Sequence, residues 1–223
     1  MEKKKRYALV STFDKSGLKQ ICTNFKKNNI SIISTGATGK YIKKIGFNCI
    51  SVESLTKFKE ILDGRVKTLH PKIFASLLFK RKNKQHIKTF ESLNFPKIDF
   101  VVINLYPFKK KINQKSNVDE CIEMIDIGGP SLMRASAKNF YDITTICDPK
   151  YYKNFLKDLN KNDGNTSLSF RKKMSQKVFE HTSSYDKIIS EWLIPKSKKF
   201  NSNKKITLRY GENPNQKASL LLK

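Results

Sequence analysis

The chain has 223 residues, enough for one large domain or for one domain with an appendage. Lys and Arg number 45 against 19 Asp and Glu, which gives a formal net charge of +26. Such a charge suits nucleic acid or an anionic small molecule. The excess is mostly lysine, is spread along the whole chain and comes with abundant Asn and Ile, a trio that AT-rich codons produce. Without an RNP, helix-turn-helix, zinc-finger or arginine-rich signature, nucleic acid is not the expected partner.

The cysteines and the apolar runs predict a cytoplasmic protein. The four cysteines are far apart and form no C-x-x-C pair, so free thiols in a reducing compartment are expected. The apolar run 7–10 is too short for a signal peptide. No stretch approaches the ~20 apolar residues that a membrane span needs, so no membrane partner is expected.

The periodicity of apolar residues predicts strands alternating with helices. Strands are expected at 7–11, 31–35, 48–52, 100–106 and 143–147, and helices at 15–27, 36–44, 118–124, 131–140 and 167–192. This order predicts an α/β fold with a parallel sheet covered on both faces. Ligands of such sheets bind beyond the carboxyl ends of the strands, where Ser11, Thr35, Asn104 and Tyr106 are expected.

Two short segments suit an anionic ligand. The turn 35–38, Thr-Gly-Ala-Thr, offers free N–H groups, hydroxyls and a helix N-terminus to a phosphate, although many such turns are only turns. In the segment 63–71, Arg65 and Lys67 could grip a phosphate or stabilise an oxyanion, and the alternative is a basic surface loop. The three histidines are expected to have structural roles, and no cluster has the spacing of a metal site.

The stretch 125–139 holds the most unusual local pattern. The pair Gly128-Gly129 predicts backbone conformations closed to other residues, and Pro130 suits the first turn of the helix that follows. On that helix Arg134 and Lys138 share a face, together with Ser131, Ala135 and Asn139. A solvated cationic face is the alternative interpretation, and Asp126 just before the turn favours a site.

Together, six segments resemble one family. They are Ser11-x-x-Asp14-Lys15-x-Gly17, 34–38, 63–71, Asn104-Leu105-Tyr106-Pro107-Phe108, 125–130 and 134–139, and they cover residues 6 to about 190. In this order and spacing they resemble the IMP cyclohydrolase domain of the bifunctional purine enzyme PurH. The resemblance implies a three-layer, methylglyoxal-synthase-like (Rossmann-like) α/β fold with a parallel sheet and a C-terminal helical extension.

The resemblance also implies a reaction, the closure of the purine ring that converts the formylated ribotide FAICAR to IMP with loss of water. Lys138 matches the family's proton-transferring lysine, and Lys67, Tyr106 and Asp126 match residues that orient the formyl group and stabilise its oxygen. The positions that match the nucleotide site are Ser11, Asp14, Lys15, Thr35, Gly36, Ala37, Thr38, Arg65, Val66, Thr68, Asn104, Ile127, Gly128 and Gly129. Ala37 stands where the family usually has a second glycine, which is expected to tighten the phosphate turn.

The resemblance implies three parts: a cyclohydrolase domain at 1–193, a linker at 194–206, and the start of a transformylase domain at 207–223, where 209–216 looks like that domain's opening motif. The cyclohydrolase needs no cofactor or metal; 10-formyltetrahydrofolate belongs to the transformylase, whose activity is not expected from these residues alone. Expected partners are the nucleotide and either a second copy, as a homodimer, or a separate transformylase chain. The alternative is a non-catalytic nucleotide-binding domain of the same fold.

Overall fold

The computed structural model describes residues 5–112, 117–194, 205–208 and 218–221. The chain forms two compact units, Met1–Asp186 and Lys187–Lys223. In the second unit, β6 (Lys205–Leu208) pairs with β7 (Ala218–Leu221) in antiparallel fashion. The motif at 209–216 and most of the predicted linker lie outside the described residues.

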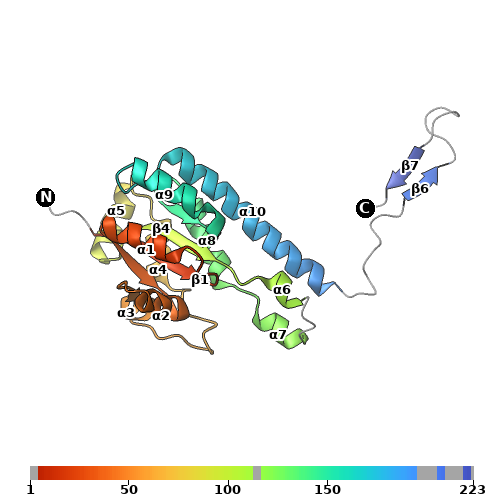
Figure 1. The fold of residues 1–223 in the computed structure, drawn as a ribbon, viewed down its shortest axis with the longest axis horizontal. Helices are drawn as coiled ribbons and strands as arrows, with labels where there is room; N and C mark the ends of the chain where they lie inside the picture. Colours follow the sequence, from red (N-terminus) through yellow and green to blue (C-terminus); the bar gives the residue numbers. More distant parts are fainter. Residues whose placement is uncertain (1–4, 113–116, 195–204, 209–217, 222–223) are drawn as a thin grey trace. The chain divides into compact units, whose positions relative to one another are not determined.

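A five-stranded sheet forms the centre of the first unit (Figure 1). Its strands are β1 (Arg6–Thr12), β2 (Ile30–Ser34), β3 (Ile50–Ser51), β4 (Ile98–Asn104) and β5 (Thr144–Ile146), in the order β3-β2-β1-β4-β5. All neighbouring strands are parallel. The order of connection reverses beside β1, and ligands of doubly wound sheets bind at such a switch point.

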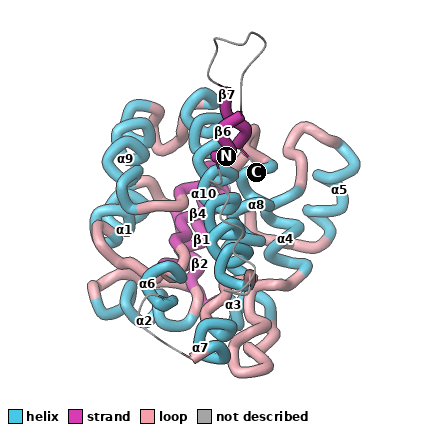
Figure 2. The backbone as a smooth tube through the Cα atoms, turned by 90° about the vertical axis from the view of Figure 1, so that its right-hand side faces the viewer, coloured by secondary structure: helices cyan, strands magenta, loops and turns pink. Residues whose placement is uncertain are grey.

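Helices cover both faces of the sheet. They are α1 (Leu18–Lys27), α2 (Gly36–Lys44), α3 (Val52–Thr56), α4 (Pro71–Leu78), α5 (Lys84–Ser92), α6 (Phe108–Ile112), α7 (Val118–Glu123), α8 (Gly128–Lys138), α9 (Tyr152–Lys161) and α10 (Leu168–Leu193), with a 3-10 turn, η1, at Pro149–Tyr151. Figure 2 shows α1 and α9 on one side of the strands and α4 and α8 on the other. The three layers confirm the expected fold class.

The apolar faces of these elements explain the packing. Six of the seven residues of β4 are buried, as expected of a central parallel strand covered on both faces. Between the sheet and helices α1 and α9, the rings of Phe25, Phe100 and Phe155 contact one another with centroids 5.5–6.0 Å apart. Aromatic side chains of this size dominate the energetics of a core.

The five predicted strands and five predicted helices are present, with shifted ends. The predicted strand 48–52 is reduced to Ile50–Ser51 because Ser51 caps α3, its side chain accepting a bond from the Ser54 N–H. The helices α3, α4, α5, α6 and α9 were not predicted. Among the described residues no helix has the length and apolarity to cross a membrane, and no group of three His, Cys, Asp or Glu residues could hold a metal ion.

Candidate active site

Short polar side chains tie the carboxyl ends of β1 and β2 together. The hydroxyls of Ser11 and Thr35 lie 2.9 Å apart. The hydroxyl of Thr38 donates to the Thr12 carbonyl at 2.9 Å and accepts from the Thr12 N–H at 3.1 Å. Because Thr38 is buried and bonded in this way, it fixes the turn 35–38 against the end of β1.

Residues 35–38, predicted from the sequence as a turn, are the N-cap and the first turn of α2. This helix N-terminus has the features of an anion site. Thr35, the N-cap, makes no side-chain capping bond, and the first turn holds no acidic residue. The first N–H groups of a helix lack intrahelical partners and attract negative charge. Ala37 and Gly36 are exposed here, so the departure from the family at Ala37 leaves the N–H groups accessible.

Lysine side chains surround this turn. A Cβ on Gly36 would lie 2.8 Å from Lys67 Nζ, so the ammonium group sits directly beside the glycine. An adjacent pocket of about 160 Å³ is lined by Thr35, Gly36, Lys40, Lys43, Lys67 and Glu53, among others. The geometry therefore combines a helix N-terminus with three cationic side chains, which suits a phosphate group.

The loop 57–70 carries four of the predicted residues, Arg65, Val66, Lys67 and Thr68. Lys67 forms an ion pair with Glu60 of the same loop, and Arg65 forms one with Glu123 of α7. The Lys67 ammonium lowers the pKa of the Glu60 carboxyl. The side chains of Glu60 and Arg65 are 45% and 65% exposed, so both pairs lie in a solvent-screened setting where an ion pair stabilises little and a ligand can replace one partner.

The two glycines that begin α8 lie where neighbouring atoms leave little room for a side chain. Neither has the positive φ expected from the sequence, so that expectation was wrong. A Cβ on Gly129 would lie 2.5 Å from Asp126 Oδ2 and 2.6 Å from Leu105 Cδ2, and a Cβ on Gly128 would lie 3.0 Å from Thr68 Oγ1. The pair therefore lets the loop of Thr68 and the carboxylate of Asp126 approach the start of the helix.

Asp126 is the carboxylate of this site. Its Oδ1 accepts a 2.8 Å bond from the Gly129 N–H, and its own N–H donates to the Tyr185 hydroxyl at 2.8 Å. Burial raises the pKa of Asp126, and the Gly129 N–H opposes that shift. Tyr185 of α10 was not predicted as a functional residue, because no local pattern joins it to a turn 59 residues earlier.

Asn104 shapes the loop after β1. Its Oδ1 accepts from the N–H groups of Phe13 and Asp14 at 2.7 and 2.8 Å, and its Nδ2 donates to the Asp14 carbonyl at 2.8 Å. The Ser16 N–H bonded to Asp14 lowers the pKa of that carboxyl. Lys15 Nζ donates to the carbonyls of Thr12 and Phe13, so it stays above the strand end.

Three further predicted residues, Tyr106, Ile127 and Val66, are apolar or aromatic. The ring of Tyr106 meets that of Phe13 edge to face, with centroids 4.5 Å apart. Ile127 is exposed just before α8. Val66 forms an isolated bridge with Ile61 within the loop 57–70. The carboxyl edge thus brings together the predicted residues from β1, β2, β4, this loop and the start of α8.

Lys138 does not join this group. It is the last residue of α8, roughly 15 Å along the helix from Gly128 at 1.5 Å per residue, and it is exposed. The next residue, Asn139, donates from its amide to the carbonyls of Leu77 and Phe79, at the end of α4. Asn139 and Ala135, expected on the cationic face, are buried. Within one chain, Lys138 therefore lies at the opposite end of α8 from Asp126.

The parallel strand order β3-β2-β1-β4-β5, with helices on both faces (Figure 2), places the chain in the class of doubly wound α/β domains. The chain belongs to the MGS-like domain family, whose model matches residues 17–131. Residues 136–223 match a second model, described as AICARFT/IMPCHase bienzyme.

Similar proteins agree with this assignment. The chain is 45% identical over 221 residues to the bifunctional purine biosynthesis protein PurH of Ruminiclostridium cellulolyticum, covering 95% of this chain and 43% of that protein. It is 45% identical over 218 residues to PurH of Oenococcus oeni, covering 96% and 42%. The chain therefore spans less than half the length of these relatives. A structure titled "Crystal structure of ForH" shares the fold, with TM-score 0.74 and 24% identity over 83% of this chain and 95% of that one.

Proposed function

We propose that residues 1–193 form an IMP cyclohydrolase domain that closes the purine ring of FAICAR. The carboxamide nitrogen attacks the formyl carbon and forms a C–N bond. The formyl oxygen then leaves as water, with one proton from the carboxamide nitrogen and one from the formamido nitrogen. The observation that carries the proposal is the meeting of Lys67, Thr68 and Asp126 around Gly36, Gly128 and Gly129.

The site supplies groups for each part of this reaction. The turn 35–38 and Lys67 would hold the 5′-phosphate. Asp126, whose pKa burial raises, is a stronger base than an exposed carboxylate and would accept the carboxamide proton. Tyr106 at the end of β4 would lie near the formyl oxygen. Because an amide nitrogen is a poor nucleophile, holding it against the formyl carbon would supply much of the acceleration.

Lys67 has two possible tasks in this scheme. As placed, its ammonium lies beside Gly36 and pairs with Glu60, which suits contact with the phosphate. The family resemblance assigns it to the formyl oxygen, and that task requires the side chain to leave Glu60 and turn toward Asp126. The two tasks differ in kinetics, since a phosphate contact made equally in the ground and transition states changes KM and an oxyanion contact changes kcat.

We further propose that this cyclisation uses no cofactor or metal and acts on a free nucleotide in the cytoplasm. Residues 207–223 would begin a transformylase domain, to which 10-formyltetrahydrofolate would belong. The chain would act as a homodimer or beside a separate transformylase chain.

One observation favours a second candidate function. Because Lys138 lies at the opposite end of α8 from Asp126, it could act beside Asp126 only if a second copy of the chain brings it there. A non-catalytic nucleotide-binding domain would need the anion turn but not Lys138. Three alternatives follow: a catalytic dimer in which Lys138 acts in the site of a second copy, a catalytic monomer that relies on Lys67, and a binding domain that needs neither role. Substitution of Lys138 distinguishes them.

The test is the ultraviolet absorbance of FAICAR mixed with the purified chain, with Lys67→Ala, Lys138→Ala and Arg134→Lys beside it. The control substitution lies on α8 one turn before Lys138, where Arg134 is exposed. The cyclohydrolase predicts conversion to IMP by the parent and by Arg134→Lys, and loss of conversion in Lys67→Ala.

The Lys138→Ala variant decides how the site is built. If it is inactive, and a mixture of inactive Lys67→Ala and Lys138→Ala proteins regains activity, Lys138 acts in the site of a second copy. If it is active, Lys67 suffices. A folded parent that binds IMP and converts no FAICAR would contradict the cyclohydrolase and favour the binding domain.

A further inference from the structure

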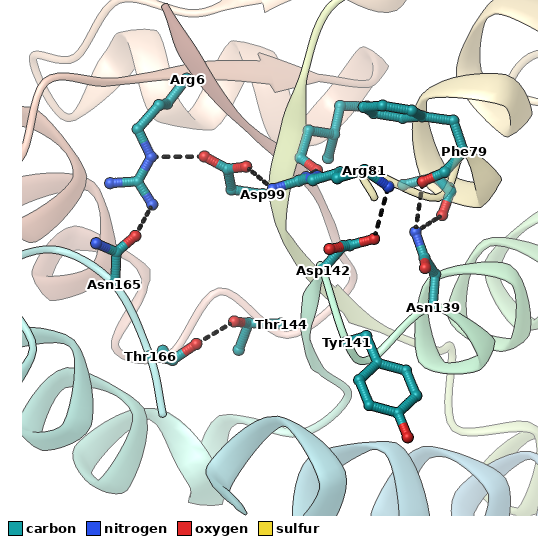
Figure 3. A network of polar contacts seen from close by, with 12 residues as sticks. Arg6, Phe79, Arg81, Asp99, Asn139, Tyr141, Asp142, Thr144, Asn165 and Thr166 are labelled. Carbon is teal, nitrogen blue, oxygen red and sulfur yellow. Dashed lines mark hydrogen bonds and ion pairs between the residues drawn. The ribbon is translucent and has the colours of Figure 1, made fainter. Parts of the chain in front are cut away.

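A second group of charged side chains lies at the amino ends of the strands. Arg6 begins β1, Asp99 is the second residue of β4, and Thr144 begins β5. Arg81 follows α4 and Arg171 lies in α10, and with these residues they line a polar pocket of about 150 Å³. Figure 3 shows Arg6, Asp99 and Arg81 in a row, with Thr144 and Thr166 facing them across open space.

The arginines in this pocket outnumber the carboxylates. Asp99, whose side chain is 6% exposed, is held by Arg6 Nε at 2.5 Å and by Arg81 Nη1 at 2.6 Å. Asp142 accepts a bond from the Arg81 backbone N–H at 3.1 Å. Three arginines and two aspartates line the pocket, so its lining has one positive charge in excess. Asp158 does not line the pocket, and its carboxylate accepts bonds from the N–H and the hydroxyl of Ser167.

The pocket also contains donors without acceptors. Nη1 and Nη2 of Arg81 each carry two protons, and among the described residues each makes one hydrogen bond, to Asp99 Oδ1 and to the Ile98 carbonyl. The Nε–H of Arg81 has no partner, but it is buried and out of the reach of a ligand. The hydroxyls of Thr144 and Thr166 are 2.6 Å apart and buried, and their mutual bond uses only one of their two protons. Arg171 is fixed at the rim by donating to the carbonyls of Phe140, Tyr141 and Thr166. A ligand that accepts hydrogen bonds would be stabilised by the remaining N–H groups of the guanidiniums.

We propose that this pocket binds one small oxyanion of the size of inorganic phosphate. The excess positive charge selects an anion, and the planar guanidinium forks and hydroxyls match the oxygens of a tetrahedral oxyanion. A volume of about 150 Å³ is well below the ~300–1,000 Å³ of drug-sized ligand pockets, which excludes a nucleotide. The site is separate from the turn 35–38, because the seven residues of β1 span roughly 20 Å between the two edges.

The arginine side chains themselves report on this site. The chain has six arginines, so the six Nε–H signals can be followed by nuclear magnetic resonance while inorganic phosphate is added. Sodium chloride at matched ionic strength is the salt control. The proposal predicts saturable shifts of the Arg81 and Arg171 signals, in the parent and also in Lys67→Ala, whose anion turn is weakened.

Two substitutions test the donors separately. Arg81→Lys keeps the positive charge beside Asp99 and removes the guanidinium fork, and we expect phosphate affinity to fall about tenfold. Thr166→Val keeps the shape and removes one hydroxyl, with an expected loss of roughly threefold. Arg134→Lys, on the exposed face of α8, should leave the affinity unchanged.

Three results would overturn the proposal. The first is the absence of a saturable shift at Arg81 and Arg171. The second is a shift confined to Arg65, which would place the phosphate at the candidate active site. The third is a shift of all six signals that chloride reproduces, which would show only general screening.

Discussion

The two edges of the sheet use charge in different ways. At the amino edge, Asp99 is buried between two guanidiniums, and the arginines also bind backbone carbonyls. At the carboxyl edge, short uncharged side chains such as Ser11, Thr38 and Asn104 fix the backbone, and the cations pair with exposed carboxylates of nearby loops. Buried pairs are costly to break and exposed pairs are easily exchanged. The buried pairs at the amino edge therefore hold the strands together, whereas the exposed pairs at the carboxyl edge can be broken at little cost.

The largest effect that would test this comparison is the loss of Asp99. Asp99→Ala leaves two partly buried guanidiniums without their carboxylate, so we expect the free energy of unfolding, measured in urea, to fall by about 3–5 kcal/mol. The matched control is Glu180→Gln, which breaks the exposed pair with Lys177 and should leave the unfolding midpoint near that of the parent. Equal effects of the two substitutions would contradict the distinction between the edges.

Asp126→Asn should separate activity from stability. We expect FAICAR conversion to fall about 10²-fold to 10³-fold, because an amide cannot accept the carboxamide proton. Because the pKa of Asp126 is raised in the folded chain, this carboxyl binds its proton more tightly there than in the unfolded chain. The stability of the parent therefore falls as the pH rises from the pKa of the unfolded chain through that of the folded chain. Asparagine can still accept the Gly129 N–H and removes this pH dependence.

The measurements for Asp126→Asn are the rate against pH and the unfolding midpoint against pH. In the parent, the rate should fall as pH is lowered through the raised pKa. A variant as active as the parent would refute the role of Asp126 as base. A lower unfolding midpoint for the variant at neutral pH would contradict the inference that burying the charged carboxylate destabilises the parent.

Lys67→Ala is expected to lower kcat/KM about 10²-fold with little change in stability, because the lost partner Glu60 is exposed. A change confined to KM would place the ammonium at the phosphate, and a change in kcat would place it at the formyl oxygen. Lys153→Ala, at an exposed position of α9, is the control for general loss of positive charge. A large loss of stability would show that the loop 57–70 depends on this ion pair.

The smallest effect is expected from Glu60→Gln. This substitution releases Lys67 from its carboxylate, so the affinity for IMP measured by calorimetry should rise a few-fold. Glu53 lines the same pocket as Lys67, and Glu53→Gln should have a smaller effect. Weaker IMP binding in Glu60→Gln would mean that Glu60 contacts the ligand and does not compete with it.

The sequence alone determined the class of fold and the residues of the carboxyl edge. β1 and β4 each contain an apolar run, and α1, α2 and α8 begin at or just after a glycine, so both kinds of element can be predicted from neighbours in the chain. The turn 35–38 and the residues Asn104 and Asp126 were also predicted, since in a parallel sheet a residue just after a strand lies at one known edge.

Only the tertiary structure decided which side chains meet. Arg6 contacts Asp99 and Asn165 across separations of 93 and 159 residues, and no local period predicts such pairs. The helical period put Asn139 on the cationic face, yet packing against α4 buries it, and the length of α8 carries Lys138 away from Asp126. Gly128 and Gly129 are needed for the space that Thr68 and Asp126 occupy. Local hydrogen bonding and periodicity depend on residues that are neighbours in the chain. Contacts between distant side chains depend on how separate helices and strands pack.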